Sequence, residues 1–373
     1  MKKLLWLILF LISATTPAYA DDKAVLQQAY QLLLDKYIEP VEIPQLFEPA
    51  IKSLQSVDKN LRVALEKNSV TVYYKNKMHK VYSRPRNGKD ALAWAKFTDY
   101  LLSELKKISP ILEHRDFELV EVMLYNGMQK LDKNSHYFPT LDIGQTTEKP
   151  QGYASGVVDN KVLYVRLGTI NDYTTQKLTD DLQKHQELNG IVLDLRGNKG
   201  GYLAQALRIA DNFLSSGKII YTIGKDAGKR KNYRAHEGEF HKNAPMVILV
   251  DGKTASSAEV LALSLKEHGR AKLVGAQTYG KNSVQNIYKL DNGAYMSLTT
   301  EKFFSPRGIP VEEVGLRPNV CSEVFDTTSD IAELVAYPYN FMCQKLSRDS
   351  SYDLDVALYI LAHSDKAANK TDF

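Results

Sequence analysis

Excess charge of either sign is small in this sequence. The 373 residues include 48 Lys and Arg against 44 Asp and Glu, which gives a formal net charge of +4 at pH 7. Removal of Lys2 and Lys3 with the leader described below lowers that charge to +2. A chain so close to neutrality has no electrostatic case for binding nucleic acid. The basic run at residues 225–231 is therefore interpreted as a solvated loop.

Long apolar runs are absent after the first 20 residues. Lys2 and Lys3 precede an apolar run at residues 4–12, and Ala-Tyr-Ala at residues 18–20 comes just before an acidic pair. This order predicts a secretory signal peptide at residues 1–20. The run is shorter than the ~20 residues that span a bilayer, and the cleavage site has no Cys for lipid attachment. We expect export to the periplasm, without stable membrane insertion after cleavage, as a mature chain of 353 residues.

Cysteine is equally scarce. Cys321 and Cys343 are the only two, and both are near the C-terminus. In an oxidising compartment a disulfide between them is plausible, and two buried free thiols are the alternative.

Several well-known site motifs are also missing. There is no G-x-G-x-x-G, residues 236–241 lack the spacing of a helical zinc motif, and no Ser-His-Asp set can be assembled by spacing. Residues 275–281 fit G-x-x-x-x-G-K, the phosphate-binding loop. However, Asn282 stands where that loop needs Ser or Thr, and a strand pattern follows where it needs a helix. The sequence therefore argues against nucleotide and zinc chemistry.

A change of pattern near residues 145–155 predicts two parts. Before it, the pattern is helical from residue 24 to about residue 65, again at residues 91–105 and 117–131, with a small hairpin at residues 70–82. After it, strands alternate with helices of 10 to 15 residues. The strands are expected at residues 162–167, 190–195, 246–250 and 272–275, and the helices at residues 175–188, 202–214 and 256–268. Alternation of this kind predicts an α/β core with a largely parallel sheet.

Ser256 is the first candidate for chemistry. It follows the expected strand at residues 246–250 and opens the next helix, whose first amides have no partner within the helix. Such amides suit an oxyanion forming at an attacked carbonyl. An isolated serine at this position is more often only an N-cap.

Lys281 is the second candidate, in the sequence Gly280-Lys281-Asn282 before a strand. A lysine held partly buried in a turn can lose its proton and act as a base toward serine, provided its pKa falls from about 10.4 to ~7–8. The alternative is a solvated loop charge. The third candidate is the glycine-rich turn at residues 194–201. It can supply an oxyanion donor from Gly200 or Gly201, or it is an ordinary turn with Asp194 and Arg196 in a structural pair.

Together these segments resemble the carboxyl-terminal processing peptidases, the tail-specific Ser–Lys proteases of the S41 type. Residues 254–259 (TASSAE) are similar to the family pattern S-A-S-A-S-E, and residues 280–285 (GKNSVQ) are similar to G-K-G-S-V-Q. Lys281 follows Ser256 by 25 residues, which is the usual spacing in the family. Residues 194–201 (DLRGNKGG) match the family's oxyanion loop. The resemblance implies Ser256 as nucleophile, Lys281 as base, Gln285 as the residue that orients the lysine, and Ser257, Gly200 and Gly201 as oxyanion donors.

The N-terminal part also resembles the family, at residues 37–41 and 131–138. The implied organisation is a signal peptide at residues 1–20, a helical region at 21–150, an S41-type core with a crotonase-like sheet at 151–320, and a helical tail at 321–373. In typical members a PDZ domain of about ninety residues precedes the first core strand. Only residues 139–161 are available here, so selection of substrates by β-augmentation is in doubt. Asn282 in place of the usual glycine is a smaller departure.

The resemblance implies an exported serine endopeptidase that acts on envelope proteins through an acyl-enzyme, without a metal or organic cofactor. It also implies protein substrates and homo-oligomers such as occur among relatives, and it leaves an adaptor protein open. Two alternatives are a catalytically silent scaffold that binds protein tails and a crotonase-like enzyme acting on thioesters. Intact Ser256, Lys281 and Gln285 argue against the scaffold, and export from the compartment that supplies coenzyme A argues against the thioester enzyme.

Overall fold

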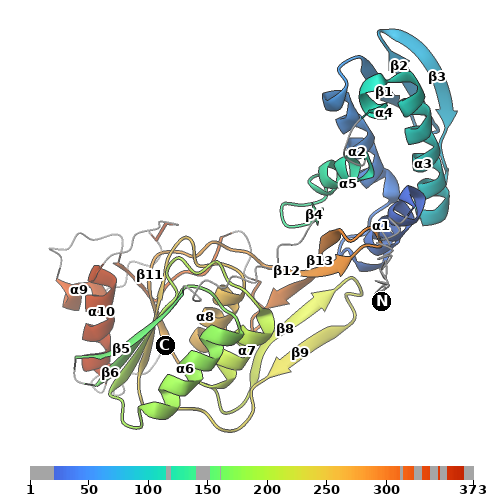
Figure 1. The fold of residues 1–373 in the computed structure, drawn as a ribbon. Helices are drawn as coiled ribbons and strands as arrows, with labels where there is room; N and C mark the ends of the chain where they lie inside the picture. The colour runs from blue at the N-terminus through green and yellow to red at the C-terminus, as the bar shows by residue number, and fades with distance from the viewer. Residues whose placement is uncertain are drawn as a thin grey trace, which may run out of the picture. The chain divides into compact units, whose positions relative to one another are not determined.

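The computed structural model describes residues 21–114, 119–139, 152–159, 161–310, 314–322, 330–336, 343–344 and 351–364. The predicted signal peptide and most of the expected boundary at residues 145–155 lie outside this set. The chain divides into two compact units (Figure 1). Unit 1 contains Met1–Leu141 and Asn286–Leu298, and unit 2 contains Asp142–Gln285 and Thr299–Phe373.

Unit 1 combines helices with a small antiparallel sheet. The helices are α1 (Asp22–Lys36), α2 (Ile43–Val57), α3 (Ala91–Ile108), α4 (Pro110–Glu113) and α5 (Leu119–Met128). The sheet consists of β1 (Leu61–Leu65), β2 (Ser69–Tyr74) and β3 (Lys77–Ser83), in that order. The helical pattern expected up to about residue 65 was wrong at residues 61–65, which form a strand after α2 ends at Val57. The reason is an alternation of period two, since Leu61 and Val63 are buried and Arg62 between them is exposed.

A hairpin far along the chain completes unit 1. Its strands are β12 (Ser283–Lys289) and β13 (Tyr295–Phe304), and β13 pairs antiparallel with β4 (His136–Phe138). Four apolar residues of the hairpin join the core of unit 1: Leu290, Ala294, Met296 and Leu298. No local sequence pattern assigns this hairpin to the N-terminal unit, from which it is far removed in the chain.

Unit 2 is built on a six-stranded sheet of mixed orientation. The strands run in the order β14 (Val320–Cys321), β11 (Lys272–Gly275), β10 (Met246–Val250), β7 (Gly190–Asp194), β6 (Val162–Leu167) and β5 (Tyr153–Val158). Neighbours from β14 to β6 are parallel, and β5 is antiparallel to β6. The prediction of an α/β core with a largely parallel sheet is confirmed.

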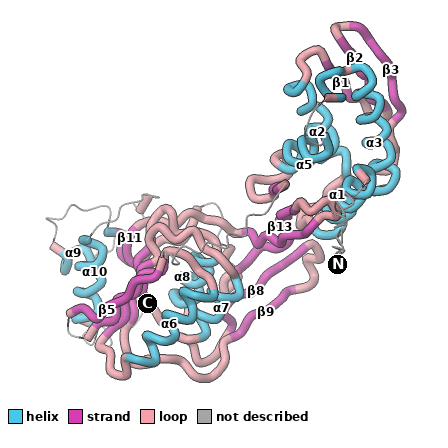
Figure 2. The backbone as a smooth tube through the Cα atoms, in the orientation of Figure 1, coloured by secondary structure: helices cyan, strands magenta, loops and turns pink. Residues whose placement is uncertain are grey.

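Helices cover both faces of this sheet (Figure 2). On one side lie α6 (Asp172–Lys184), α7 (Leu203–Asp211) and α8 (Ser257–Glu267), and on the other lie α9 (Ile331–Ala336) and α10 (Ser351–Ala362). The alternation along β7 shows the two-sided burial, because Ile191 and Leu193 pack in the α6–α8 core while Val192 packs with Val356 of α10. The carboxyl ends of β7, β10 and β11 thus lead into loops from the buried middle of the sheet.

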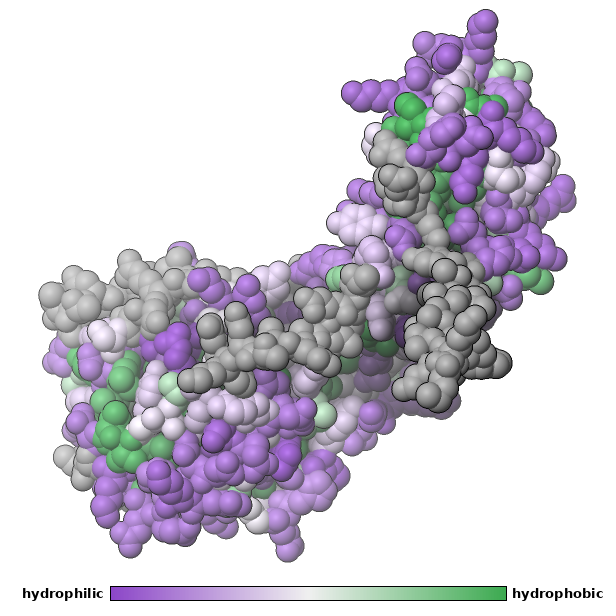
Figure 3. Space-filling view, viewed as in Figure 1, coloured by the Kyte–Doolittle hydropathy of each residue, from purple (hydrophilic) through white to green (hydrophobic). Residues whose placement is uncertain are grey.

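A second sheet in unit 2 was not predicted. Strands β8 (Lys218–Gly224) and β9 (Arg230–Arg234) form an antiparallel pair, and β8 also pairs with β13. The basic run at residues 225–231 is mainly the exposed turn of this hairpin. Hydrophilic side chains dominate the displayed faces (Figure 3). Within the described ranges, no helix is both long enough and apolar enough to cross a membrane.

The two cysteines are joined. Cys321, at the end of β14, forms a disulfide with Cys343. The sulfur of Cys343 also lies 3.5 Å from the carbonyl oxygen of Gly275, the last residue of β11. The disulfide therefore fastens the C-terminal segment beside the loop that leads to Lys281.

Candidate active site

Ser256 lies at the turn between β10 and α8, as the sequence predicts. Its backbone has φ +58° and ψ −123°, a conformation that residues with a Cβ rarely adopt. The residue is partly exposed, whereas Ser257 beside it is buried. Strain of this kind persists only where the surroundings enforce it, and it gathers at functional sites. Ser256 is therefore held in a forced position at the positive end of the α8 dipole.

Glu259, in the first turn of α8, holds the serine turn through its carboxylate. One oxygen of its carboxylate, Oε2, accepts hydrogen bonds from the backbone amides of Ser256 and Lys281, both at 2.9 Å. The other oxygen, Oε1, accepts from the Thr278 hydroxyl at 2.5 Å and from the Gly280 amide at 2.7 Å. A single side chain thus fixes the serine turn and the lysine loop to each other.

Glu259 is fully buried. Burial raises the pKa of its carboxyl above the usual value, and the hydrogen bonds from Thr278, Lys281, Gly280 and Ser256 act in the opposite direction. Its position three residues after Ser256 is that of the acidic residue in a capping box. This spacing is the sequence signal that could have identified Glu259, which was read only as part of the motif.

The glycine-rich loop after β7 lies against the serine. A Cβ added to Gly200 would be 3.0 Å from Cβ of Ser256 and 3.0 Å from the backbone nitrogen of Ser257. Gly200 also has φ +96°. Both facts demand glycine at this position. Gly201 packs against a different segment, since a Cβ added to it would lie 2.0 Å from the carbonyl oxygen of Ile170.

The loop is tied to the serine turn by several hydrogen bonds. The amide of Ala255 donates to the carbonyl of Asn198 at 2.9 Å, and the Thr254 hydroxyl donates to the carbonyl of Leu195 at 2.9 Å. Asp251 accepts from the Gly197 amide at 3.0 Å. The amide of Gly200 donates to the Asn198 side chain at 2.8 Å. Asn198, Asp251 and Thr254 lie within or beside the predicted motifs, but no role was predicted for them from the sequence.

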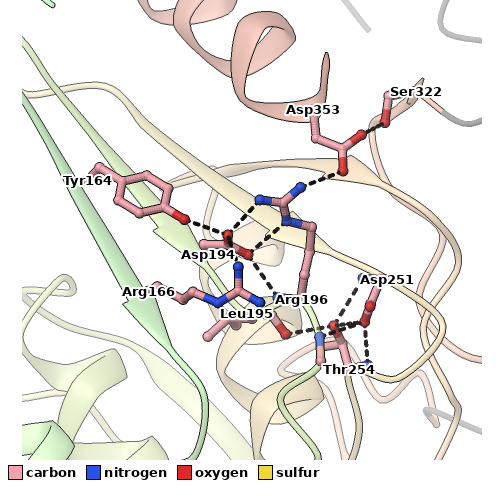
Figure 4. A network of polar contacts seen from close by, with 10 residues as sticks. Tyr164, Arg166, Asp194, Leu195, Arg196, Asp251, Thr254, Ser322 and Asp353 are labelled. Carbon is pink, nitrogen blue, oxygen red and sulfur yellow. Dashed lines mark hydrogen bonds and ion pairs between the residues drawn. The ribbon is translucent and has the colours of Figure 1, made fainter. Parts of the chain in front are cut away.

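At the base of the loop lies a buried ionic network (Figure 4). Arg196 donates from Nε to Asp194 at 2.9 Å and from a terminal nitrogen at 2.7 Å, which confirms the structural pairing considered from the sequence. Its other terminal nitrogen donates to Asp353 of α10 at 3.0 Å. Tyr164 also donates to Asp194, at 2.7 Å. Burial opposes ionisation of Asp194, but Arg196 and Tyr164 outweigh it and lower the pKa of the carboxyl.

The remaining predicted residues follow Lys281 along the chain. Gln285 is on β12 and donates to Ser283 at 2.8 Å and to Thr299 at 3.4 Å. The side-chain amide of Asn282 is buried, and neither of its polar atoms has a hydrogen-bond partner within the described part of the chain. No helix follows residues 275–281, since β12 begins at Ser283. The phosphate-loop alternative is thereby excluded by the structure as well.

The comparisons with known proteins point to the same segments. The family model of Peptidase family S41 matches residues 161–322, which include the serine turn, the lysine loop and the glycine-rich loop. Residues 161–322 are thus similar to peptidase family S41. This confirms the family resemblance inferred from the three motifs.

Two curated relatives illustrate the extent of the similarity. The carboxy-terminal-processing protease of Bartonella bacilliformis is 34% identical over 172 residues, which cover 44% of this chain and 40% of the relative. The carboxy-terminal processing protease CtpA of Bacillus subtilis is 32% identical over 188 residues, which cover 50% of this chain and 40% of the relative. The chain thus matches about two fifths of the length of these relatives.

Among solved structures, the chain is similar to a photosystem II D1 C-terminal processing protease. The two are 30% identical with a TM-score of 0.40, over 50% of this chain and 48% of that one.

Proposed function

We propose that this protein is a serine endopeptidase in which Ser256 is the nucleophile and Lys281 is the general base. The observation that carries the proposal is the Glu259 carboxylate, which holds the Ser256 and Lys281 amides on one oxygen atom at 2.9 Å each. The strained backbone of Ser256 and the match of residues 161–322 to peptidase family S41 support it.

The reaction proceeds through an acyl-enzyme. Neutral Lys281 takes the hydroxyl proton of Ser256, whose oxygen forms a bond to the carbonyl carbon of the substrate. The tetrahedral intermediate collapses as the carbon–nitrogen bond breaks, and Lys281 returns the proton to the leaving amine. Water then attacks the ester, Lys281 accepts a proton from it, and the serine oxygen leaves with that proton.

The oxyanion of both intermediates needs hydrogen-bond donors. The Ser257 amide at the start of α8 is the first, because a first-turn amide has no acceptor in its own helix. The Gly200 loop, which lies against Ser257, supplies the second. Gln285 orients Lys281 in this scheme. The signal-peptide pattern of residues 1–20 supports export, and protein chains of the cell envelope are the proposed substrates.

Cleavage of a fluorescently labelled, unfolded protein by residues 21–373 tests the proposal. We expect cleavage by the wild type and its loss in Ser256→Ala and in Lys281→Ala. Ser216→Ala and Lys272→Ala, which replace exposed residues of the same unit, are the matched controls. Undiminished cleavage by Ser256→Ala contradicts the proposal. Absence of cleavage by all five proteins favours an enzyme that depends on an adaptor, or a scaffold that binds protein tails.

A further inference from the structure

The C-terminal helix α10 reaches the candidate active site through one side chain. Asp353 lies in the first turn of α10, beyond the region that matches the peptidase family, which ends at residue 322. Its carboxylate accepts a hydrogen bond from Arg196 at 3.0 Å on one oxygen and from the Ser322 hydroxyl at 2.6 Å on the other. Figure 4 shows the Arg196 guanidinium between Asp194 and Asp353.

All members of this chain of contacts are buried. Asp194 is 0% exposed, and Arg196 and Asp353 are each 5% exposed. In such surroundings an ion pair is sensitive to the loss of either partner, because the remaining charge stays out of water without compensation. Arg196 is also held from both sides, so that its guanidinium plane has one orientation. Its direction is therefore set jointly by β7 and by α10.

Arg196 begins the loop that ends against the nucleophile. The next residue is Gly197, whose amide donates to Asp251. Gly200, four residues after Arg196, lies against Ser256 and Ser257. Within the loop, the buried side chain of Asn198 donates to the carbonyl of Leu167 at 2.8 Å and accepts from the Gly200 amide at 2.8 Å. The anchor at Arg196 is thus connected to Gly200 through a short backbone segment and through Asn198.

We propose that Asp353 is a positioning residue for the oxyanion loop, acting through Arg196. The C-terminal helix is then a working part of the active site, although no atom of it touches the substrate. The inference rests on the proposed peptidase function for its kinetic consequence, and on the structure alone for the anchoring of the loop.

Asp353→Asn tests the inference, with Asp355→Asn as the matched control. Asp355 is on the same helix but is exposed. The two variants therefore make the same change in charge, and only Asp353→Asn alters a buried contact. Hydrogen–deuterium exchange of a peptide covering residues 195–202 is the first measurement. We expect about tenfold faster exchange in Asp353→Asn and none of this effect in Asp355→Asn. Equal exchange in the two variants overturns the inference, whether or not the protein proves to be a peptidase.

Kinetics separate a positioning role from a merely structural one. Below the unfolding temperature of each variant, kcat of Asp353→Asn should fall about tenfold with KM within about twofold, because the oxyanion exists only after attack. Inhibition by a peptide boronic acid, which forms a tetrahedral adduct on serine, should weaken in parallel with kcat. A rise in KM with unchanged kcat contradicts the inference.

A milder variant covers the case in which Asp353→Asn does not fold. Ser322→Ala removes only the hydrogen bond to the second oxygen of Asp353. It should show the same pattern at about two- to threefold in kcat and boronate affinity. No change in either quantity contradicts the role of Asp353.

Discussion

The carboxylate of Glu259 accepts a hydrogen bond of 2.9 Å from the backbone amide of Lys281, and the same oxygen accepts one of 2.9 Å from Ser256. The proposed base and nucleophile are therefore positioned by a residue that takes no proton in the reaction. The positions of Ser256 and Lys281 thus depend on a buried carboxylate with two acceptor oxygens, which together accept four hydrogen bonds.

Glu259→Gln should lower kcat about 100-fold. A glutamine offers one acceptor oxygen and turns an NH₂ group toward donors that already point inward, so one of the two loops must shift. A displacement of about 1 Å at reacting groups is sufficient for a loss of that size. The measurement is kcat on a peptide substrate, with Glu187→Gln, at an exposed surface ion pair, as the control. Activity equal to that of Glu187→Gln would show that the carboxylate is dispensable.

Comparison of the wild type with Glu259→Gln also tests the pKa of Glu259. Its folded-state pKa is raised from 4.5. The native protein then binds more protons than the unfolded chain between the two pKa values, so stability decreases as pH rises through that interval. The free energy of unfolding of the wild type minus that of Glu259→Gln should therefore shrink from pH 4.5 upward and become constant above the folded pKa. Urea unfolding at a series of pH values measures it, and a difference that grows with pH means that the pKa is lowered instead.

Gly200→Ala should abolish most of the activity. The new methyl group would lie 2.8 Å from the carbonyl oxygen of Ala255 and 3.0 Å from the Ser257 nitrogen, at a residue with φ +96°. The loop must move away from the Ser257 amide and carry its own proposed oxyanion donor out of place, and loss of one such donor lowers kcat about 100- to 1,000-fold. Gly156→Ala, with no atom within 4 Å of the added Cβ, is the control. Full activity in Gly200→Ala would place the oxyanion elsewhere.

Two exposed tyrosines belong to the segments that form the proposed site. Tyr202 is 58% exposed and follows the glycine-rich loop, and Tyr279 is 47% exposed with its amide donating to the carbonyl of Thr254. Large aromatic surfaces beside a nucleophile are suited to hold apolar side chains of a substrate. Tyr202→Ala and Tyr279→Ala should each raise KM about 2- to 10-fold for a peptide with apolar residues near the cleaved bond. Tyr173→Ala, an exposed tyrosine on α6, is the control. Equal KM values for all three would remove the tyrosines from substrate binding.

The disulfide should stabilise unit 2. Cys321 and Cys343 are 22 residues apart, and closure of a loop of that size stabilises a protein by about 3 kcal/mol. A reducing agent should lower the unfolding temperature of the wild type. The double variant Cys321→Ser and Cys343→Ser should already have the lower temperature and not respond to the agent. An unfolding temperature of the wild type that does not change after complete reduction contradicts this expectation.

Much of unit 2 could be predicted because its signals are local. The bounds of β6, β10 and β11 were predicted to the residue, since each is a short apolar run ended by a polar or glycine residue. The strand at residues 61–65 was missed, because two buried positions in five residues are too few to separate a period of two from a helical period. The buried partners of the site were missed for a different reason. Asp353 is 157 positions from Arg196 in the sequence, and no local pattern carries a contact at that distance.

The hairpin at residues 286–298 also sets an order of events during synthesis. Unit 1 takes its core residues Leu290 and Met296 from that hairpin, and β4 finds its partner there. A ribosome or a secretion channel that has released only the first 141 residues has therefore released an incomplete unit. The N-terminal unit can finish folding only after residues 142–285 have followed it. A chain truncated between residues 141 and 286 should therefore lack a stable N-terminal unit.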